Sequence, residues 1–247
     1  MPSRAATGCD NVPMTALFAG LTTLDVLHRL DHVPDPSLKV TSTDFTMAAG
    51  GPATNAAVTY AALCAASRVS SGPEHEAGAA SGAPADSEEA PILLTALGEG
   101  PVAAFLAADL AAVGVRVMDA TAPASSPASR EPAVSSIIEH PNGRMVASTN
   151  ARLDADAERV VAELPERVGA VLIDGHNPAL AHAALTLGVP EVDGEDPFAL
   201  LEARPPHPRI LDGGSWKDWL TPLLGFVDIA VVSEDFALPL MARPDGP

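Results

Sequence analysis

The chain has 247 residues, of which 47% are hydrophobic and 19% charged, and its formal net charge is −18. This length suits one sizeable domain or two small ones, and the acidic balance excludes a nucleic-acid binder, which needs a basic face. Two cysteines are too few for a disulfide framework, no apolar run approaches the ~20 residues of a membrane helix, and the N-terminus lacks a secretory signal, so we expect a cytoplasmic protein without nucleic-acid or membrane contacts.

The first elements lead into a glycine turn. ALFAGLTTLDVLH, residues 16–28, is predicted as one β segment with Asp25 near its end, and β-like runs follow around Leu38–Val40 and Asp44–Met47. In AAGGPATNAAV the paired glycines suit a tight turn or a close backbone approach. Pro52 then fits the first turn of an alanine-rich helix, whose free N–H groups can bind a polar ligand.

A low-complexity stretch interrupts the chain after this helix. Residues 67–90 are rich in Ser, Gly, Pro, Ala and acidic side chains. Such a composition cannot bury enough apolar surface to order itself, and added length in a surface loop costs little entropy. We therefore predict a disordered insertion at 67–90.

Beyond the insertion, short apolar strands alternate with helices. Strands are predicted in PILLTALGEG, VRVMDAT, AVLIDG, PRILDGG and VDIAVVS, and helices in VAAFLAADLAAVG, PALAHAALTLG and SWKDWLTPLLG. This alternation predicts a single α/β domain over 16–247 with a mostly parallel, doubly covered sheet. The stretch VSSIIEHPNGRMVAST reads as a hairpin turning at Asn142-Gly143. The hairpin (133–149) and the early β runs (38–47) do not fit this alternation of strands and helices, so we expect them to form a small β lid.

The order of these signals resembles the ribokinase-like (PfkB) family of carbohydrate and nucleoside kinases. AGLTTLDVLH resembles that family's first strand with its substrate-binding Asp, and AAGGPATNAAV its G-G-x-x-x-N signature. TALGEGPVAAFLAADLAAVGV loosely matches the family's G-x-D segment, and DIAVVSEDF the strand before its nucleotide site. AVLIDGHNP resembles the sugar-facing loop, and its D-G-H-N is closest to ketohexokinase-like and fructokinase-like members.

The resemblance implies a set of ligand-binding residues. The predicted sugar-binding residues are Asp25, Gly50, Gly51, Asn55, Asp174, His176 and Asn177. Asp212 and Ser233 are predicted to face ATP, with Asp212 helping Mg²⁺ through water. A carboxylate accepts hydrogen bonds from vicinal hydroxyls, and an amide both donates and accepts them. Without the resemblance, Asp25 would be a turn cap, Asn55 a helix start and Asp212 part of a glycine turn.

One family element is not found in these residues. The D-T-x-G-A-G-D segment supplies the family's anion hole and general base, and the sequence contains nothing similar. Ser233 and Phe236 also stand where the family carries the Asn and Glu of N-x-x-E. We therefore assign no catalytic residue, and we expect that the chain alone does not phosphorylate a sugar. We also expect a truncated sheet whose open edge favours self-association.

The implied function is an ATP-dependent carbohydrate kinase acting on a sugar, with a ketose such as fructose preferred and a homodimer through the β lid. The alternative is a non-catalytic sugar-binding or degenerate relative. A dinucleotide-binding enzyme is disfavoured because A-G-G-P-A-T-N lacks the G-x-G-x-x-G spacing. The seven histidines show no H-x-x-x-H pattern, so no metal ligands are assigned.

Overall fold

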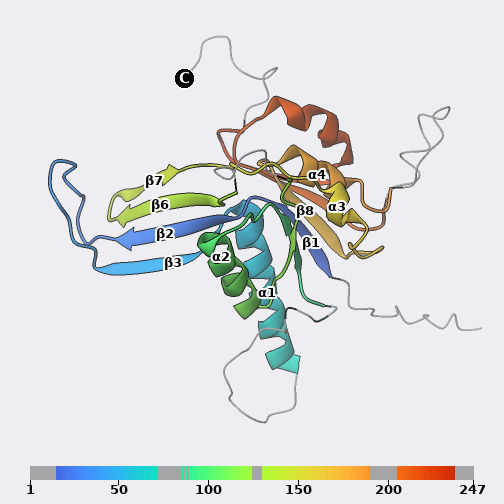
Figure 1. Ribbon diagram of the computed structural model, residues 1–247, viewed down its shortest axis with the longest axis horizontal. Helices are drawn as coiled ribbons and strands as arrows, with labels where there is room; N and C mark the ends of the chain where they lie inside the picture. Colours follow the sequence, from blue (N-terminus) through green and yellow to red (C-terminus); the bar gives the residue numbers. More distant parts are fainter. Residues whose placement is uncertain are drawn as a thin grey trace, which may run out of the picture.

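Two β-sheets organise the chain: a parallel core sheet and a smaller mixed sheet that extends from it (Figure 1). The computed structural model describes residues 15–71, 85, 87, 89–123, 130–189 and 205–236, and it does not describe the side chains of 68–71. Most of the predicted insertion, from 72 to 84, lies outside these residues.

The core sheet is parallel throughout, as the alternating strands and helices predict. Each of its six strands pairs in parallel with its neighbours. In spatial order they are β10 (Ile229–Val232), β9 (Arg209–Gly213), β8 (Ala170–Asp174), β1 (Ala16–Gly20), β4 (Ile92–Thr95) and β5 (Arg116–Asp119). The predicted fold class, an α/β domain with a mostly parallel sheet, is therefore confirmed.

Helices cover both faces of the core sheet. On one face lie α1 (Pro52–Ser71) and α2 (Pro101–Ala112); the other carries α3 (Glu158–Val161), α4 (Pro178–Leu185) and the 3₁₀ helix η2 (Asp218–Phe226). Ala53, Ala57 and Ala61 recur every fourth residue of α1 and are all buried against the sheet. A stripe of small side chains lets the helix axis approach the strands closely, which explains the alanine-rich sequence.

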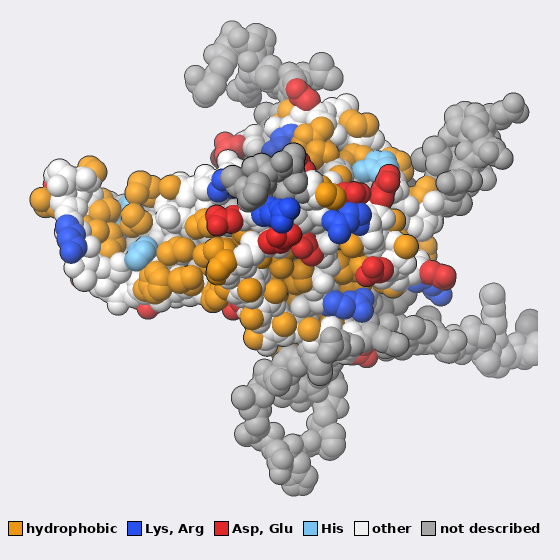
Figure 2. All heavy atoms as spheres, viewed as in Figure 1, with side chains coloured by type: hydrophobic (Ala, Val, Ile, Leu, Met, Phe, Trp, Pro, Cys, Tyr) orange, Lys and Arg blue, Asp and Glu red, His pale blue; other side chains and the backbone are white. Residues whose placement is uncertain are grey.

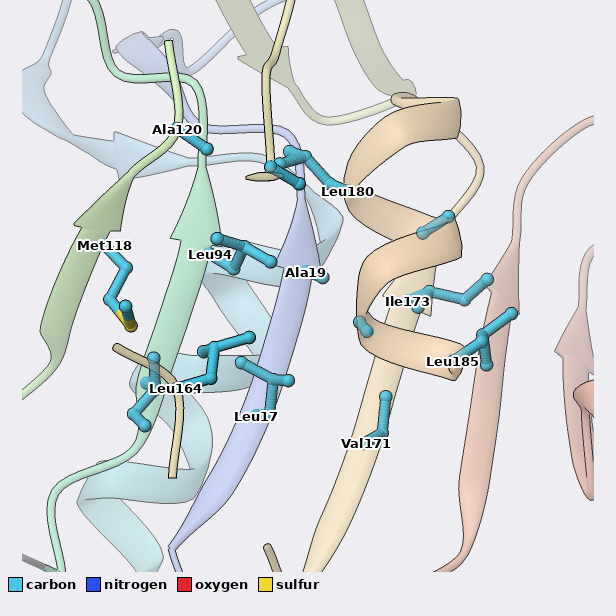
Figure 3. Close-up of a cluster of buried hydrophobic side chains, with 14 of the residues drawn as sticks. Leu17, Ala19, Leu94, Met118, Ala120, Leu164, Val171, Ile173, Leu180 and Leu185 are labelled. Carbon is cyan, nitrogen blue, oxygen red and sulfur yellow. The ribbon is translucent and has the colours of Figure 1, made fainter. Parts of the chain in front are cut away.

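The opposite face holds the larger hydrophobic core. Leu17, Leu94, Val171 and Ile173 point from neighbouring strands toward Leu180 and Leu185 of α4 (Figure 3). These side chains are at most 1% exposed. Burial of each such Leu, Ile or Val contributes about 1.5–3 kcal/mol, so this face anchors the strands whose ends form the candidate site.

The second sheet, here named the lid sheet, has four strands in the order β3-β2-β6-β7. Their bounds are β2 (Thr23–Arg29), β3 (Asp44–Gly50), β6 (Ala133–His140) and β7 (Gly143–Ser148). The lid was predicted in part: 133–149 forms a hairpin and 44–47 lies in a strand, but Leu38–Val40 is not in a strand. The hairpin loop consists of Pro141 and Asn142, because His140 pairs with Gly143.

The segment 16–28 is two strands rather than the single one predicted. It passes from the core sheet to the lid sheet at Leu21–Thr22. The Thr22 hydroxyl lies 2.9 Å from the hydroxyls of both Thr54 and Thr95, and Thr95 donates to the carbonyl of Gly20 at 2.8 Å. These buried side-chain hydrogen bonds replace the ladder that a continuous strand would have made. Asp25 therefore belongs to the lid sheet.

Two further boundaries differ from the sequence prediction. Helix α1 continues through Ser71, into the range 67–90 predicted as insertion. The stretch SWKDWLTPLLG forms the 3₁₀ helix η2, with Pro222 inside it. Proline has no N–H and cannot take part in the α-helical ladder, which favours the shorter-ranged helix here.

Among the exposed hydrophobic side chains, two groups stand out: one over the lid sheet and α2, and one on the edge strand β10. Over the lid sheet and α2 they spread across one face of the molecule (Figure 2). All four residues of the edge strand β10 are exposed, and Val231 is 61% accessible. An apolar strand at the edge of the described sheet is a surface that favours association.

Candidate functional site

The glycine turn places the Asp25 carboxylate against the start of α1. In the lid sheet Asp25 pairs with Ala48, and a Cβ at Gly50 would lie 2.1 Å from Asp25 Oδ2. A side chain there would displace the Asp25 carboxylate, which explains the first glycine. Gly51 has φ +104°, and a Cβ on it would lie 2.3 Å from the carbonyl oxygen of Leu21. Gly50 therefore suits the close approach of the Asp25 carboxylate. Gly51 suits both the close approach of the Leu21 carbonyl and a backbone conformation that glycine favours.

Asp25 itself is half-buried in the lid sheet. Burial raises the pKa of its carboxyl above the ordinary 3.8, while a hydrogen bond with Ser135 and the charge of Arg144 lower it. Ser135 is its register partner on β6. The carboxylate thus keeps acceptor capacity for a ligand beside the glycine turn.

Asp174 ties three segments together at the end of β8. Its Oδ2 accepts hydrogen bonds from the N–H groups of Leu21 at 2.8 Å and Ala53 at 3.2 Å, and its Oδ1 accepts one from His176 at 2.9 Å. Its side chain is buried, with 1% exposure. Burial raises the pKa of this carboxyl above its ordinary value. The nearby His176 and the three N–H donors act in the opposite direction and lower the pKa, but the effect of burial is larger. The carboxylate is thus engaged in positioning the lid connection and the first turn of α1.

His176 and Asn177 line a narrow crevice at the carboxyl edge of the core sheet. Its enclosed volume is about 20 Å³, room for one water-sized group. The walls also include the connection Gly20–Thr22 and the exposed Arg152. The Asn177 amide oxygen caps α4 by accepting from the N–H groups of Ala179 and Leu180 at 3.1 and 3.2 Å, which leaves its amide nitrogen as a donor.

Asn55 and Asp212 share a separate, wider groove between α1 and the sheet, with a volume of about 510 Å³. The N–H of Asn55 donates to the carbonyl of Gly51 at 2.8 Å, so Asn55 stands one helical turn from the glycine turn, with its side chain exposed. Asp25 is not among the residues that line this groove. Ser233 lies close to Asp212 because β9 and β10 are paired, and its hydroxyl donates to the carbonyl of Gly214.

The predicted residues thus fall into three groups, at the glycine turn, in the crevice and in the groove. Asp25, Gly50 and Gly51 surround the turn, with Asp174 beneath it; His176 and Asn177 line the crevice; Asn55 and Asp212 line the groove. The carboxyl ends of parallel strands are the usual ligand position in open α/β sheets.

Two basic residues near this edge were missed in the sequence. A Cβ on Gly175 would lie 3.3 Å from the Lys217 Nζ, so the ammonium group lies over the loop that carries His176. Arg152 lines the crevice directly. Lys217 follows the L-D-G-G of β9, and Arg152 follows the lid hairpin. The signal that could have found them is a basic residue near a predicted site residue in an otherwise acidic chain.

Within the described ranges, no group of three or more His, Cys, Asp and Glu side chains could hold a metal ion. Asp212 alone offers a half-buried carboxylate in the groove, so these residues do not by themselves form a Mg²⁺ site. Among the same residues, the helices are all too short or too polar to span a lipid bilayer.

Comparison with known proteins identifies the fold. No family model and no curated protein sequence matches the chain. Solved structures do match: a presumed ribokinase from Agrobacterium tumefaciens (23% identity, TM-score 0.58) and the ribokinase of Giardia lamblia (10%, 0.56). Each match covers 90% of this chain, and 60% and 58% of those chains. A microbiome-derived acarbose kinase matches over 92% of this chain and 64% of its own, at 13% identity and TM-score 0.60.

The fold is therefore the ribokinase-like α/β fold, and the structural neighbours are ribokinases and another carbohydrate kinase. The chain spans about 60% of the length of the first structures that it matches.

Proposed function

We propose that this chain forms the sugar-binding part of an ATP-dependent carbohydrate kinase, with a ketose such as fructose as its preferred substrate. The observation that carries the proposal is the Asp25 carboxylate packed against Gly50, at the turn from which α1 begins. A glycine pair that brings backbone, carboxylate and helix N-terminus together suits a ligand with many hydroxyl groups.

Each predicted sugar residue has a distinct part in this proposal. Asp25 accepts hydrogen bonds from sugar hydroxyls, and Gly50 and Gly51 let the backbone approach the ring. Asn55 adds an exposed amide one turn further along α1, and His176 and Asn177 contribute a ring nitrogen and an amide nitrogen from the crevice. Asp174 positions this set through its three backbone hydrogen bonds.

The groove would receive the phosphate donor. Asp212 lines this groove near the end of β9, and Ser233 follows the neighbouring parallel strand β10; hydroxyl and backbone groups at such strand ends suit a nucleotide. ATP, when bound, supplies the phosphoryl group that a sugar hydroxyl attacks. The residues of this chain would orient the sugar, and the lid sheet would exclude water by closing over it.

Calorimetric titration of the purified chain with fructose and with ribose tests the proposal. We expect saturable binding at millimolar sugar, with fructose tighter, and at least ~10-fold weaker binding after Asn55→Ala. Asn142→Ala, at the exposed hairpin tip, is the matched control and should bind as the wild type does. Failure of both sugars to bind, with the chain folded, would exclude this function.

The second candidate is a sugar-binding protein without kinase activity. It is favoured by the lack of any D-T-x-G-A-G-D segment in these residues and by Ser233 and Phe236 at the N-x-x-E positions. Coupled detection of ADP release in the presence of the sugar that binds separates the two. Sugar binding without sugar-dependent ADP release would favour the binding protein.

We also propose a homodimer through the lid sheet. Register pairing aligns Phe45, His28, Ile138 and Met145 in one row across its four strands. Phe45 and Met145 are 53% and 57% exposed. Covering such a row in a second copy would remove apolar surface from water. Phe45→Asp should shift the sedimentation coefficient toward the monomer, and an unchanged dimer would contradict the proposal.

A further inference from the structure

An acidic side chain of α2 reaches the lid sheet beside the glycine turn. Asp109 is half-buried, and its Oδ2 accepts a hydrogen bond at 2.7 Å from the backbone N–H of Ala49, the residue before Gly50. Ala49 also packs against the hydrophobic cluster that contains Ala103 and Leu106 of α2, so the helix lies against this end of β3 (Figure 1). The hydrogen bond therefore joins a lid strand to a helix that covers the core sheet.

Strand β3 needs such a partner because it lies at the edge of the described lid sheet. In the order β3-β2-β6-β7 it pairs with β2 alone, and an edge strand leaves part of its N–H groups without a partner in the ladder. An unsatisfied backbone donor away from water is costly, and the Asp109 carboxylate satisfies this one. A hydrogen bond to an ionised carboxylate is also shorter and stronger than one to a neutral acceptor.

Two carboxylates hold the glycine turn, one on each side of it. Asp109 binds the N–H of Ala49 before the glycine pair, and Asp174 binds the N–H of Ala53 after the pair, at 3.2 Å. Asp109 belongs to α2 and Asp174 to β8, so both acids lie outside the lid sheet. Glycine has more backbone freedom than any other residue, and a turn of two glycines therefore keeps one conformation only if its flanks are fixed.

We infer that Asp109 is a positioning residue of the sugar site. By holding Ala49 it keeps Gly50 against the Asp25 carboxylate, since Asp25 pairs with Ala48 and a Cβ at Gly50 would lie 2.1 Å from Asp25 Oδ2. The inference rests on the proposed sugar-binding function and adds to that site a residue that acts through the backbone rather than by contact with the sugar. A site held in its binding geometry loses less freedom when the ligand binds, which raises affinity.

The test compares Asp109→Ala with Asp109→Asn in the full chain, by amide hydrogen exchange and by calorimetric titration with fructose and ribose. Asp109→Ala removes the acceptor, so we expect the Ala49 amide to exchange at least ~10-fold faster and sugar to bind ~5–10-fold more weakly. Asparagine keeps an amide oxygen that can accept from the same N–H, so Asp109→Asn should restore most of both properties.

Two control variants separate positioning from a general loss of stability or charge. Val102 is a half-buried side chain of α2 that packs in the same cluster, and Val102→Ala should lower the unfolding free energy but keep both the protection of Ala49 and the sugar affinity. Glu166 is an exposed acid between α3 and β8, and Glu166→Ala should change neither property.

The outcomes separate this inference from the proposed function. Unchanged exchange of Ala49 in Asp109→Ala, or faster exchange with unchanged sugar affinity, would overturn the inference and leave the sugar site standing. Equal loss of sugar affinity in Val102→Ala and Asp109→Ala would also overturn it, because the effect would then follow stability. Binding of neither sugar by the folded wild type would overturn the proposed function, and the exchange of Ala49 would still decide whether Asp109 holds the turn.

Discussion

Replacement of Asp174 by alanine is the most direct test of how the site is held together. The substitution removes the acceptor for three N–H groups, on the lid connection, on the first turn of α1 and on the loop after β8. Each buried donor left unsatisfied costs about 1–3 kcal/mol. Their sum of roughly 3–9 kcal/mol is an upper range, because the hydrogen bonds of Leu21 and His176 are only part-buried and water can enter the vacated space. We expect a loss of ~3–5 kcal/mol, a large share of the ~5–15 kcal/mol typical of a domain.

The assay is urea unfolding followed by circular dichroism, with Asp212→Ala as the matched control. Asp212 is the register partner of Asp174 on β9 and is half-exposed, so its replacement should change the unfolding free energy by less than ~0.5 kcal/mol. Asp174→Asn keeps one acceptor oxygen and should lose only about 1–2 kcal/mol. Equal stability of Asp174→Ala and Asp212→Ala would refute the view that Asp174 holds these segments together.

Three further predictions concern the glycine turn, Asp25 and the sheet edge. Gly50→Ala puts a Cβ 2.1 Å from Asp25 and should abolish sugar binding in calorimetry, whereas Gly214→Ala meets no atom within 4 Å and should bind normally; equal binding of the two would contradict the close approach. Since burial raises the pKa of Asp25, its protonation contributes stability that is present below pH 3.8 and lost as pH rises through the raised pKa. The stability advantage of wild type over Asp25→Asn should therefore fall as the pH rises above 3.8 and passes through the raised pKa. An advantage that does not change with pH in urea unfolding would contradict a raised pKa of this carboxyl. Val231→Lys, on the 61% exposed edge position, should lower the associated fraction in sedimentation velocity without lowering the unfolding free energy; unchanged association would place the contact elsewhere.

The alternation of apolar strands and helices determined the core of this protein from sequence alone. The run ILLT is buried on both faces and AVLID is buried or half-buried throughout, as expected for strands of a doubly covered parallel sheet. The same signals put Asp174 and Asp212 at strand ends, and parallel strands necessarily bring such ends to one edge. The glycine pair at 50–51 was also legible, because two adjacent glycines before a helical proline have few other uses.

Tertiary structure alone decided how these groups are used. Nothing local in residues 16–28 marks the passage from core sheet to lid sheet, since hydroxyls of Thr54 and Thr95, far along the chain, fix it. Nor does the sequence distinguish the buried Asp174, whose oxygens meet three backbone donors, from the half-exposed Asp212. Nor could the sequence place Arg152 in the wall of the crevice or the Lys217 ammonium group over Gly175, because a long-range contact has no periodicity to reveal it.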